Sequence, residues 1–355
     1  MRTVHFVLPA GVDDPGAPSG GNRYDRRLSD GLRAAGWAVR EIAAGGAWPV
    51  PDPADRDALR GSLAALPDGG LVLLDGLVSG GVPEVVAPEA RRLRTVVLVH
   101  LPLADETGLA PGAAAALDAR ERATLRAAAA VVATSEGAAR HLVGHHGLPP
   151  GRVHVAAPGV DPAPLAPGTD GASGLLCVAA VTPRKAQDVL VDALAKVPGE
   201  WHCTLVGALD RAPGYADRIR RSVDAYGLDG RVRLVGPRTG ADLDAAYAAA
   251  DLFMLPSLTE TYGMVVTEAL ARGVPVLGTD VNGVPEALGR APGGDRPGLL
   301  VPPGDPAALA EALIRWLDEP AARERLRAAA RARRAHLPGW AETVRAMAAI
   351  LEAAS

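Results

Sequence analysis

The sequence contains few of the residues on which several classes of protein depend. Of its 355 residues, only two are cysteine and only 3% are aromatic. Both cysteines, Cys177 and Cys203, lie inside apolar runs, which indicates small buried side chains rather than a disulfide or a metal pair. The scarcity of aromatic side chains argues against a protein that binds single-stranded nucleic acid by stacking its bases. The net charge of −4 gives no basic field to attract nucleic acid.

The hydropathy of the sequence also predicts no membrane-spanning helix and no secretory leader. No uncharged apolar run approaches the roughly 18 residues that a membrane-spanning helix needs. The first residues, MRTVHFVLPAG, lack the charged segment, apolar segment and cleavage site of a secretory leader. These observations favour a cytoplasmic protein. The eight histidines show no metal-ligand spacing, and the adjacent His145 and His146 should diverge on a helix, which predicts no bound metal.

Short apolar runs alternate along the chain with alanine-, leucine- and arginine-rich segments of helical period. This alternation is typical of parallel α/β sheets. The predicted strands are residues 3–10, 71–76, 95–101, 129–135, 153–159, 175–181, 201–207, 232–236, 251–257 and 275–280. The predicted helices are residues 24–35, 113–129, 137–145, 188–197, 216–226, 242–249, 267–272 and 306–317.

The length suggests two domains at ~150 residues per domain. Residues 157–174 are dense in proline and glycine and are predicted to link them. We therefore expect an N-terminal Rossmann-like domain at residues 1–165 and a second at 173–338. The tail, 339–355, is predicted to be an amphipathic helix that packs back on the first domain. Ligands of such sheets bind beyond the carboxyl ends of the strands, which predicts a cleft between the domains.

The most informative segment is LPSLTETYGMVVTEALARGVPVLGTD, residues 255–280. In it, a strand leads through a loop with Glu260 into a helix with Glu268. If the helix starts near Tyr262, the N–H groups of residues 262–265 form an anion site. Both glutamates can accept hydrogen bonds from hydroxyl groups, and Glu268 could accept from the vicinal pair of a ribose. Without other evidence for a ligand, Glu260 and Glu268 would be interpreted as ordinary exposed residues of a helix and its cap.

Two other loops carry candidate phosphate-binding residues. Arg184 and Lys185 follow the strand at 175–181, and Lys185 is one of only two lysines in the chain. Fixed cations at the end of this strand would stabilise negative charge on a ligand. Gly20 and Gly21 lie in a predicted loop at 16–22, where glycine lets the backbone approach a phosphate. The loop lacks the G-x-G-x-x-G spacing of a dinucleotide site.

Three further features complete the candidate set. His100 ends the strand at 95–101 and should face the cleft, and Asp105 and Glu106 in the next loop could bind a cationic or polyhydroxylated molecule. The arginine-rich helix at 323–334 is interpreted as a solvated face. A weak contact of this helix with a membrane surface stays open as an alternative.

These motifs together resemble retaining glycosyltransferases of the GT-B fold, in particular glycosyltransferase family 4. The segment with Glu260 and Glu268 resembles the family's E-x7-E signature. Six other stretches resemble family segments in the same order: residues 19–39, 132–143, 153–162, 178–194, 283–288 and 298–313. The agreement of order over about 300 residues makes the resemblance specific.

The resemblance implies an α/β fold of GT-B architecture, with two Rossmann-like doubly wound domains facing a central cleft. It implies transfer of a sugar from a UDP- or GDP-sugar to a hydroxyl of an acceptor, a small molecule or glycoconjugate, with retention and without a metal or other cofactor. The donor base, the sugar and the acceptor stay open. We expect a monomer or homodimer.

The resemblance also assigns roles to the candidate residues. Glu260 and His100 would contact the donor sugar, and Glu268 the ribose. Arg184 and Lys185 would neutralise the diphosphate. Asp105 and Glu106, in the loop after His100, would contact the acceptor. The remaining donor-binding residues are Gly20, Gly21, Tyr262, Gly263, Met264 and Val265.

Alternative functions use the same donor site. They are a nucleotide-sugar epimerase, a sugar phosphorylase and a non-catalytic nucleotide-sugar-binding subunit. A dehydrogenase is disfavoured because the glycine fingerprint is missing.

Overall fold

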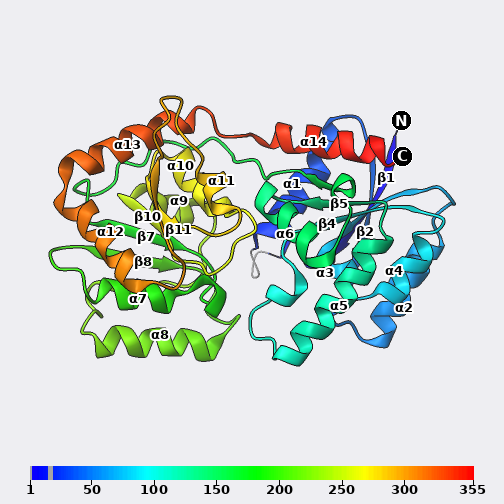
Figure 1. Ribbon diagram of the computed structural model, residues 1–355, viewed down its shortest axis with the longest axis horizontal. Helices are drawn as coiled ribbons and strands as arrows, with labels where there is room; N and C mark the ends of the chain where they lie inside the picture. The colour runs from blue at the N-terminus through cyan, green and yellow to red at the C-terminus, as the bar shows by residue number, and fades with distance from the viewer. Residues whose placement is uncertain (1, 15–18) are drawn as a thin grey trace. The chain divides into compact units, whose positions relative to one another are not determined.

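The computed structural model describes residues 2–14 and 19–355, and the chain divides into two compact units (Figure 1). Unit 1 consists of Met1–Gly159 and Pro338–Ser355, and unit 2 of Val160–Leu337. Within the described residues, each unit contains one six-stranded parallel sheet flanked by helices. The predicted α/β class with two Rossmann-like doubly wound sheets is confirmed. That the two sheets face a common cleft stays a prediction.

The sheet of unit 1 has the strand order β2-β1-β3-β4-β5-β6. Its strands are β1 (Thr3–Pro9), β2 (Ala38–Ala44), β3 (Leu71–Asp75), β4 (Arg94–Val99), β5 (Ala130–Ala133) and β6 (Val153–Val155). All residues of β3 and β5 are buried, as expected for central parallel strands that helices cover on both faces. The order reverses between β1 and β3, and ligands of such sheets bind at this kind of switch point.

The helices of unit 1 connect these strands and close its core. They are α1 (Gly20–Ala34), α2 (Pro53–Ala64), α3 (Gly76–Ser79), α4 (Pro83–Glu89), α5 (Pro111–Ala127), α6 (Glu136–His146) and α14 (Trp340–Ala353). Two short 3-10 helices, η1 (Leu103–Asp105) and η2 (Pro150–Arg152), lie in the connections.

Helix α1 begins earlier than the sequence predicted. The predicted loop at 16–22 is wrong for Gly20 and Gly21, which form the first turn of α1; residues 16–18 lie outside the described residues. The reason is Ser19, whose hydroxyl accepts a hydrogen bond from the Asn22 N–H at 3.0 Å and caps the helix.

The C-terminal helix α14 packs against α1, as the ribbon shows (Figure 1). A side chain at Gly31 of α1 would collide with Val344, so that glycine is what allows the two helices to approach. The Tyr24 ring packs edge-on against Trp340 at 5.8 Å between centroids. The Thr343 hydroxyl donates to the Ala157 carbonyl at 2.8 Å. Helix α14 is therefore part of the core of unit 1.

The sheet of unit 2 has the order β12-β11-β10-β7-β8-β9, with its switch point between β7 and β10. Its strands are β7 (Gly174–Val178), β8 (His202–Val206), β9 (Val232–Leu234), β10 (Leu252–Leu255), β11 (Val276–Thr279) and β12 (Gly298–Val301). Its helices are η3 (Pro183–Lys185), α7 (Gln187–Leu194), α8 (Pro213–Ala225), α9 (Gly240–Ala248), α10 (Met264–Ala271), α11 (Val284–Leu288), α12 (Pro306–Asp318) and α13 (Pro320–Arg334). Trp201 and Trp316 are buried in its core.

The boundary between the units lies at 159/160, whereas the sequence predicted a domain end at 165. The segment after Gly159 packs on unit 2, because Val160 and Ala163 form a small apolar cluster with Ala271. The Ala166 N–H also donates to the Arg272 carbonyl at 2.9 Å. The chain returns to unit 1 at Pro338.

The arginine-rich helix α13 is not simply a solvated face. Arg334 donates to the Ala271 carbonyl at 2.7 Å, and Arg323 donates to the Trp316 carbonyl at 2.7 Å. Guanidinium groups here satisfy backbone carbonyls of neighbouring elements, which corrects the prediction for these two residues. Within residues 2–14 and 19–355, no helix is long and apolar enough to cross a bilayer.

Candidate functional site

Two positively charged side chains and one acid meet at the switch point of unit 2. Arg184 and Lys185 are the last two residues of η3, in the loop after β7, and Glu260 lies in the loop after β10. The Lys185 ammonium donates to Glu260 Oε1, and Arg184 Nη1 lies 3.9 Å from Glu260 Oε2. The two strand-end loops thus converge, since β7 and β10 are neighbours in the sheet.

Glu260 is held as a buried carboxylate. It is 5% exposed and also accepts a hydrogen bond from the Ser257 hydroxyl at 2.8 Å. Burial favours its neutral form, but Lys185 and Arg184 outweigh burial and hold its pKa below the usual range. Burial lowers the pKa of Lys185, and Glu260 opposes that effect. Two cations against one carboxylate leave one formal positive charge.

One of the two cations, Arg184, also has a hydrogen-bond donor without an acceptor in the described part of the chain. Arg184 Nη1 lies 3.3 Å from the Thr259 carbonyl, which orients the guanidinium. Its Nε atom is buried and has no hydrogen-bond partner among the described residues. A buried N–H without an acceptor is costly unless a ligand supplies one. The residues present therefore fit a ligand that carries negative charge.

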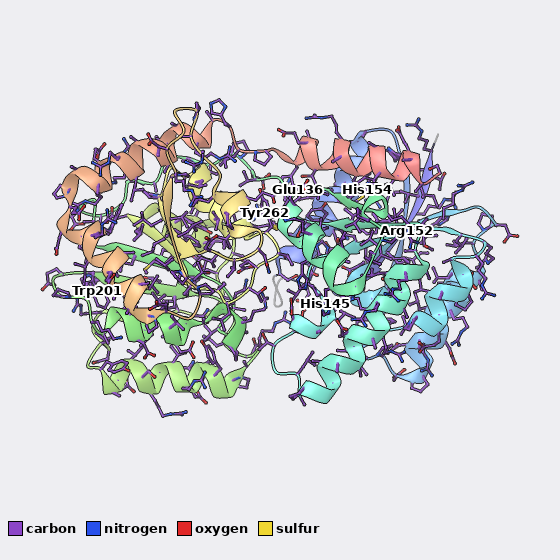
Figure 2. The ribbon with its side chains drawn as sticks, viewed as in Figure 1. Glu136, His145, Arg152, His154, Trp201 and Tyr262 are labelled. Carbon is purple, nitrogen blue, oxygen red and sulfur yellow. The ribbon has the colours of Figure 1, made fainter. Side chains whose placement is uncertain are left out.

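Helix α10 begins beside this cluster, two residues later than the predicted Tyr262. Its first residue is Met264, because Gly263 takes the left-handed conformation at φ 90°. Glycine adopts this conformation without strain. The first N–H groups of a helix lack intrahelical acceptors, so those of Met264 and Val265 are suited to bind an anion. Tyr262, labelled in Figure 2, is itself buried, and burial raises its pKa to about 12.

Glu268 lies one turn into α10 and is 8% exposed. It accepts a hydrogen bond from the Tyr247 hydroxyl at 3.0 Å. The Arg272 guanidinium lies over the Tyr247 ring at 4.4 Å. Tyr247 was not singled out in the sequence; it orients the carboxylate that the signature predicted.

A second buried cluster lies at the switch point of unit 1. His100 follows β4, Asp75 ends β3 and Asp25 lies on α1. His100 Nε2 is 2.7 Å from Asp25 Oδ1 and 3.9 Å from Asp75 Oδ2. Burial lowers the pKa of His100, and Asp75 opposes this effect. The histidine is thus held by two acids that the sequence analysis missed.

Both acids are buried beside the histidine, and burial favours their neutral forms. Asp25 and Asp75 are 0% and 3% exposed. Burial raises the pKa of Asp25 to about 7 and that of Asp75 well above its usual range. The sequence did contain one indication that Asp75 is a site residue. Asp75 is the last residue of the apolar run LVLLD, at the carboxyl end of a strand.

The other residues predicted for unit 1 lie around this cluster. A side chain at Gly21 would lie 3.2 Å from His100 Cδ2, so the first turn of α1 packs against the histidine. Gly20 precedes it as the first residue of α1. Asp105 ends η1 and is half-buried, whereas Glu106 is exposed.

In the part of the chain that the structure describes, two sets of side chains have the donor atoms of a metal site. One is Asp25, Asp75 and His100, and the other is Asp118, His145 and His146. The prediction that His145 and His146 diverge is wrong, since both approach Asp118. The reason is that Asp118 lies on a different helix, α5, and faces the last turn of α6.

Comparisons with known families cover most of the chain. Residues 170–333 match a family model described as glycosyl transferases group 1, and residues 76–164 match glycosyltransferase family 4. A D-inositol 3-phosphate glycosyltransferase from Kineococcus radiotolerans is 34% identical over 250 residues, which is 64% of this chain and 57% of that protein. One from Jonesia denitrificans is 33% identical over 268 residues, 69% of this chain and 62% of that protein. The chain thus spans about three fifths of these relatives.

Solved structures match the fold over its full length. Sucrose-phosphate synthase from Thermosynechococcus elongatus has a TM-score of 0.80 at 23% identity and covers 100% of both chains. HepE from Anabaena, solved in complex with UDP and glucose, has a TM-score of 0.78 at 18% identity, covering 99% of this chain and 100% of that one. At these identities the likeness is one of fold.

Proposed function

We propose that this chain, which resembles the GT-B glycosyltransferases of family 4, transfers a sugar from a nucleoside diphosphate sugar to a hydroxyl group of an acceptor. One observation carries the proposal. Arg184 and Lys185 converge on Glu260 at the switch point of unit 2, immediately before the N-terminus of α10. That is where a doubly wound sheet binds its ligand, and the surplus positive charge suits a diphosphate.

The donor is held by groups of unit 2. Arg184 and Lys185 bind the diphosphate, and the amides of Tyr262, Gly263, Met264 and Val265 bind its distal phosphate and sugar. The Glu260 carboxylate exchanges part of its contact with Lys185 for a sugar hydroxyl. Glu268, oriented by Tyr247, accepts from the ribose hydroxyls. The donor is a UDP- or GDP-sugar.

The reaction proceeds with retention at the anomeric carbon. The bond from that carbon to the diphosphate oxygen breaks, and the acceptor oxygen forms its bond on the same face. The departing oxygen takes the acceptor's proton, so no separate base is required. Charge grows on the diphosphate in the transition state, where the two cations and the helix N-terminus stabilise it most.

Residues of unit 1 complete the proposal. Gly20 and Gly21 cover the diphosphate, and His100, fixed by Asp25, positions a hydroxyl of the donor sugar. Asp105 and Glu106 contact the acceptor. The diphosphate itself needs no bound metal, because Arg184, Lys185 and the N-terminus of α10 stabilise its charge.

The test is a coupled assay of a panel of UDP- and GDP-sugars with D-inositol 3-phosphate as the first acceptor, chosen because the relatives carry that name. Release of UDP or GDP that depends on acceptor, with a product of retained configuration by NMR, supports the proposal. Consumption that depends on inorganic phosphate would indicate a phosphorylase. Interconversion of donor sugars without acceptor would indicate an epimerase, and binding without turnover a non-catalytic subunit.

A further inference from the structure

Helices α5 and α6 of unit 1 bring together three side chains that the proposed transfer reaction does not use. One nitrogen each of His145 and His146 and a carboxylate oxygen of Asp118 lie within 4.8 Å of one another. His145, labelled in Figure 2, is partly exposed, whereas the His146 side chain is fully buried. The cluster thus has one solvent-accessible side and one closed side.

His146 is held so that one particular nitrogen faces Asp118. Its Nε2 lies 3.2 Å from Glu121 Oε2, and Glu121 is 1% exposed. Because a carboxylate only accepts hydrogen bonds, Nε2 carries the proton and Nδ1 of a neutral ring carries the lone pair. A carboxylate behind a histidine is the arrangement that orients histidine ligands of metals.

The orphaned atom is His146 Nδ1. It is buried, has no hydrogen-bond partner among the described residues, and lies 3.9 Å from Asp118 Oδ1. In a neutral ring, its lone pair faces the lone pairs of a carboxylate, which repel it. A cation between the two atoms turns this repulsion into attraction.

His145 supplies the third donor. Its Nε2 contacts the same oxygen, Asp118 Oδ1, and its ring stacks on His141 at 5.3 Å between centroids. His141 and His145 are four residues apart on α6, a spacing that places both on one face of the helix. This i, i+4 pair was present in the sequence and was not recognised there.

We propose that Asp118, His145 and His146 bind a divalent ion of the Zn²⁺ type, which ties α5 to α6. Two imidazole nitrogens and one carboxylate oxygen are donors that Zn²⁺ prefers, and water completes the shell. Ligand atoms at ~2.0–2.2 Å from the ion lie about 3.3 Å apart in a tetrahedron, so the ion replaces the direct contact between His145 and Asp118. Arg122 pairs with the other oxygen, Oδ2, at 2.8 Å and leaves Oδ1 for the ion.

The site is connected to the loop proposed to contact the acceptor. The carboxylate of Glu121 also accepts from the Leu103 N–H, at 3.3 Å to each oxygen. Leu103 begins η1, the element that ends at Asp105. Binding of the ion therefore steadies η1 through His146 and Glu121.

The experiment uses untagged full-length protein, stripped with chelator and titrated with ZnCl₂ by calorimetry and thermal melting. We expect one ion per chain and a rise in melting temperature. His145→Ala removes a partly exposed ligand, and Asp118→Asn removes the charge; each should weaken Zn²⁺ binding at least ~10-fold. Glu121→Gln should weaken it ~10–100-fold, as loss of an outer-shell partner does. His202→Ala, an exposed histidine of unit 2, should leave binding unchanged.

Three results would overturn the proposal. They are no Zn²⁺-dependent shift in the unsubstituted protein, unchanged affinity in a folded His145→Ala variant, and an NMR spectrum with both His146 nitrogens protonated under excess Zn²⁺. The last result would mean that an imidazolium, rather than a metal, lies between Glu121 and Asp118. If His145→Ala fails to fold by circular dichroism, Asp118→Asn and Glu121→Gln provide the same comparison.

Discussion

The two units bury charge at equivalent places in their sheets and neutralise it by different means. In unit 2, Glu260 is surrounded by Lys185 and Arg184, and all three keep their charges. In unit 1, burial raises the pKa of Asp25 and of Asp75, and it disfavours the charged form of the adjacent His100 imidazole. Ion pairing leaves unit 2 with fixed positive charge for an anion, whereas the raised carboxyl pKa values make the cluster of unit 1 sensitive to pH.

The largest expected effect comes from breaking the ion pair of unit 2. Glu260→Gln leaves Lys185 and Arg184 near a neutral amide in a buried site. Removing one partner of a buried pair costs about 3–5 kcal/mol of unfolding free energy. Urea unfolding should show this loss, and Glu324→Gln, an exposed residue of α13, should change stability by less than ~0.5 kcal/mol. If Glu260→Gln lowers the unfolding free energy by no more than Glu324→Gln does, the ion pair does not contribute to stability.

The next effect concerns catalysis. Lys185→Ala, and separately Arg184→Ala, should lower kcat/KM by roughly 10²–10³, or about 2.7–4 kcal/mol, because each removes charge that stabilises the leaving diphosphate. Steady-state kinetics measure this loss. Lys196→Ala changes the only other lysine of the chain, which is exposed, and should be neutral. Normal turnover in both site variants would refute the diphosphate assignment.

The buried acids of unit 1 predict a pH dependence of stability that the ion pair of unit 2 does not. Folded Asp25 has a pKa of about 7, whereas its ordinary value is 3.8, so the folded chain holds a proton that the unfolded chain has released. Stability from this group is complete below pH 3.8 and is lost as pH rises toward 7. Relative to Asp25→Asn, the unsubstituted protein should lose about 1.4 kcal/mol between pH 5 and pH 6. Parallel stability profiles of the two proteins would contradict a raised pKa of Asp25.

The smallest effect tests how the signature glutamate is oriented. Tyr247→Phe removes the hydroxyl that donates to Glu268 while keeping the ring beneath Arg272. Loss of one hydrogen bond is worth about 1 kcal/mol, which should weaken UDP or GDP binding roughly fivefold in calorimetry. Tyr226→Phe, on an exposed tyrosine, is the matched control. Equal affinities in all three proteins would show that Glu268 does not depend on Tyr247.

The sequence predicted those elements whose packing produces a continuous apolar pattern. The run LVLLD is buried throughout and became β3, whereas the edge strand β2, AVREIAA, carries Arg40 and Glu41 and was missed. At the edge of a sheet, one side is open to solvent, so the apolar pattern is interrupted. The same limit applied to β12, whose two central leucines are only partly buried.

The candidate site was predictable where one local segment carries it. The loop and helix with Glu260 and Glu268 were identified as a unit, and Arg184 and Lys185 were placed after the correct strand. Asp25 could not be found in the same way. It lies on the apolar face of α1, and only its contacts with Asp75 and His100, 50 and 75 residues away, identify it as a candidate site residue. The sequence analysis also rejected His145 and His146 as metal ligands, because their common partner, Asp118, lies on another helix and more than 25 residues away.

Unit 2 is an uninterrupted stretch of chain inserted between two pieces of unit 1, and this has a consequence for biosynthesis. A ribosome releases the strands of unit 1 first, then all of unit 2, and α14 only at the end. Until then, the face of α1 around Gly31 has no cover, because Val344 and its neighbours have not been made. Unit 1 is therefore translated first but completed last. A nascent chain that stalls within unit 2 exposes the apolar face of α1, to which chaperones can bind.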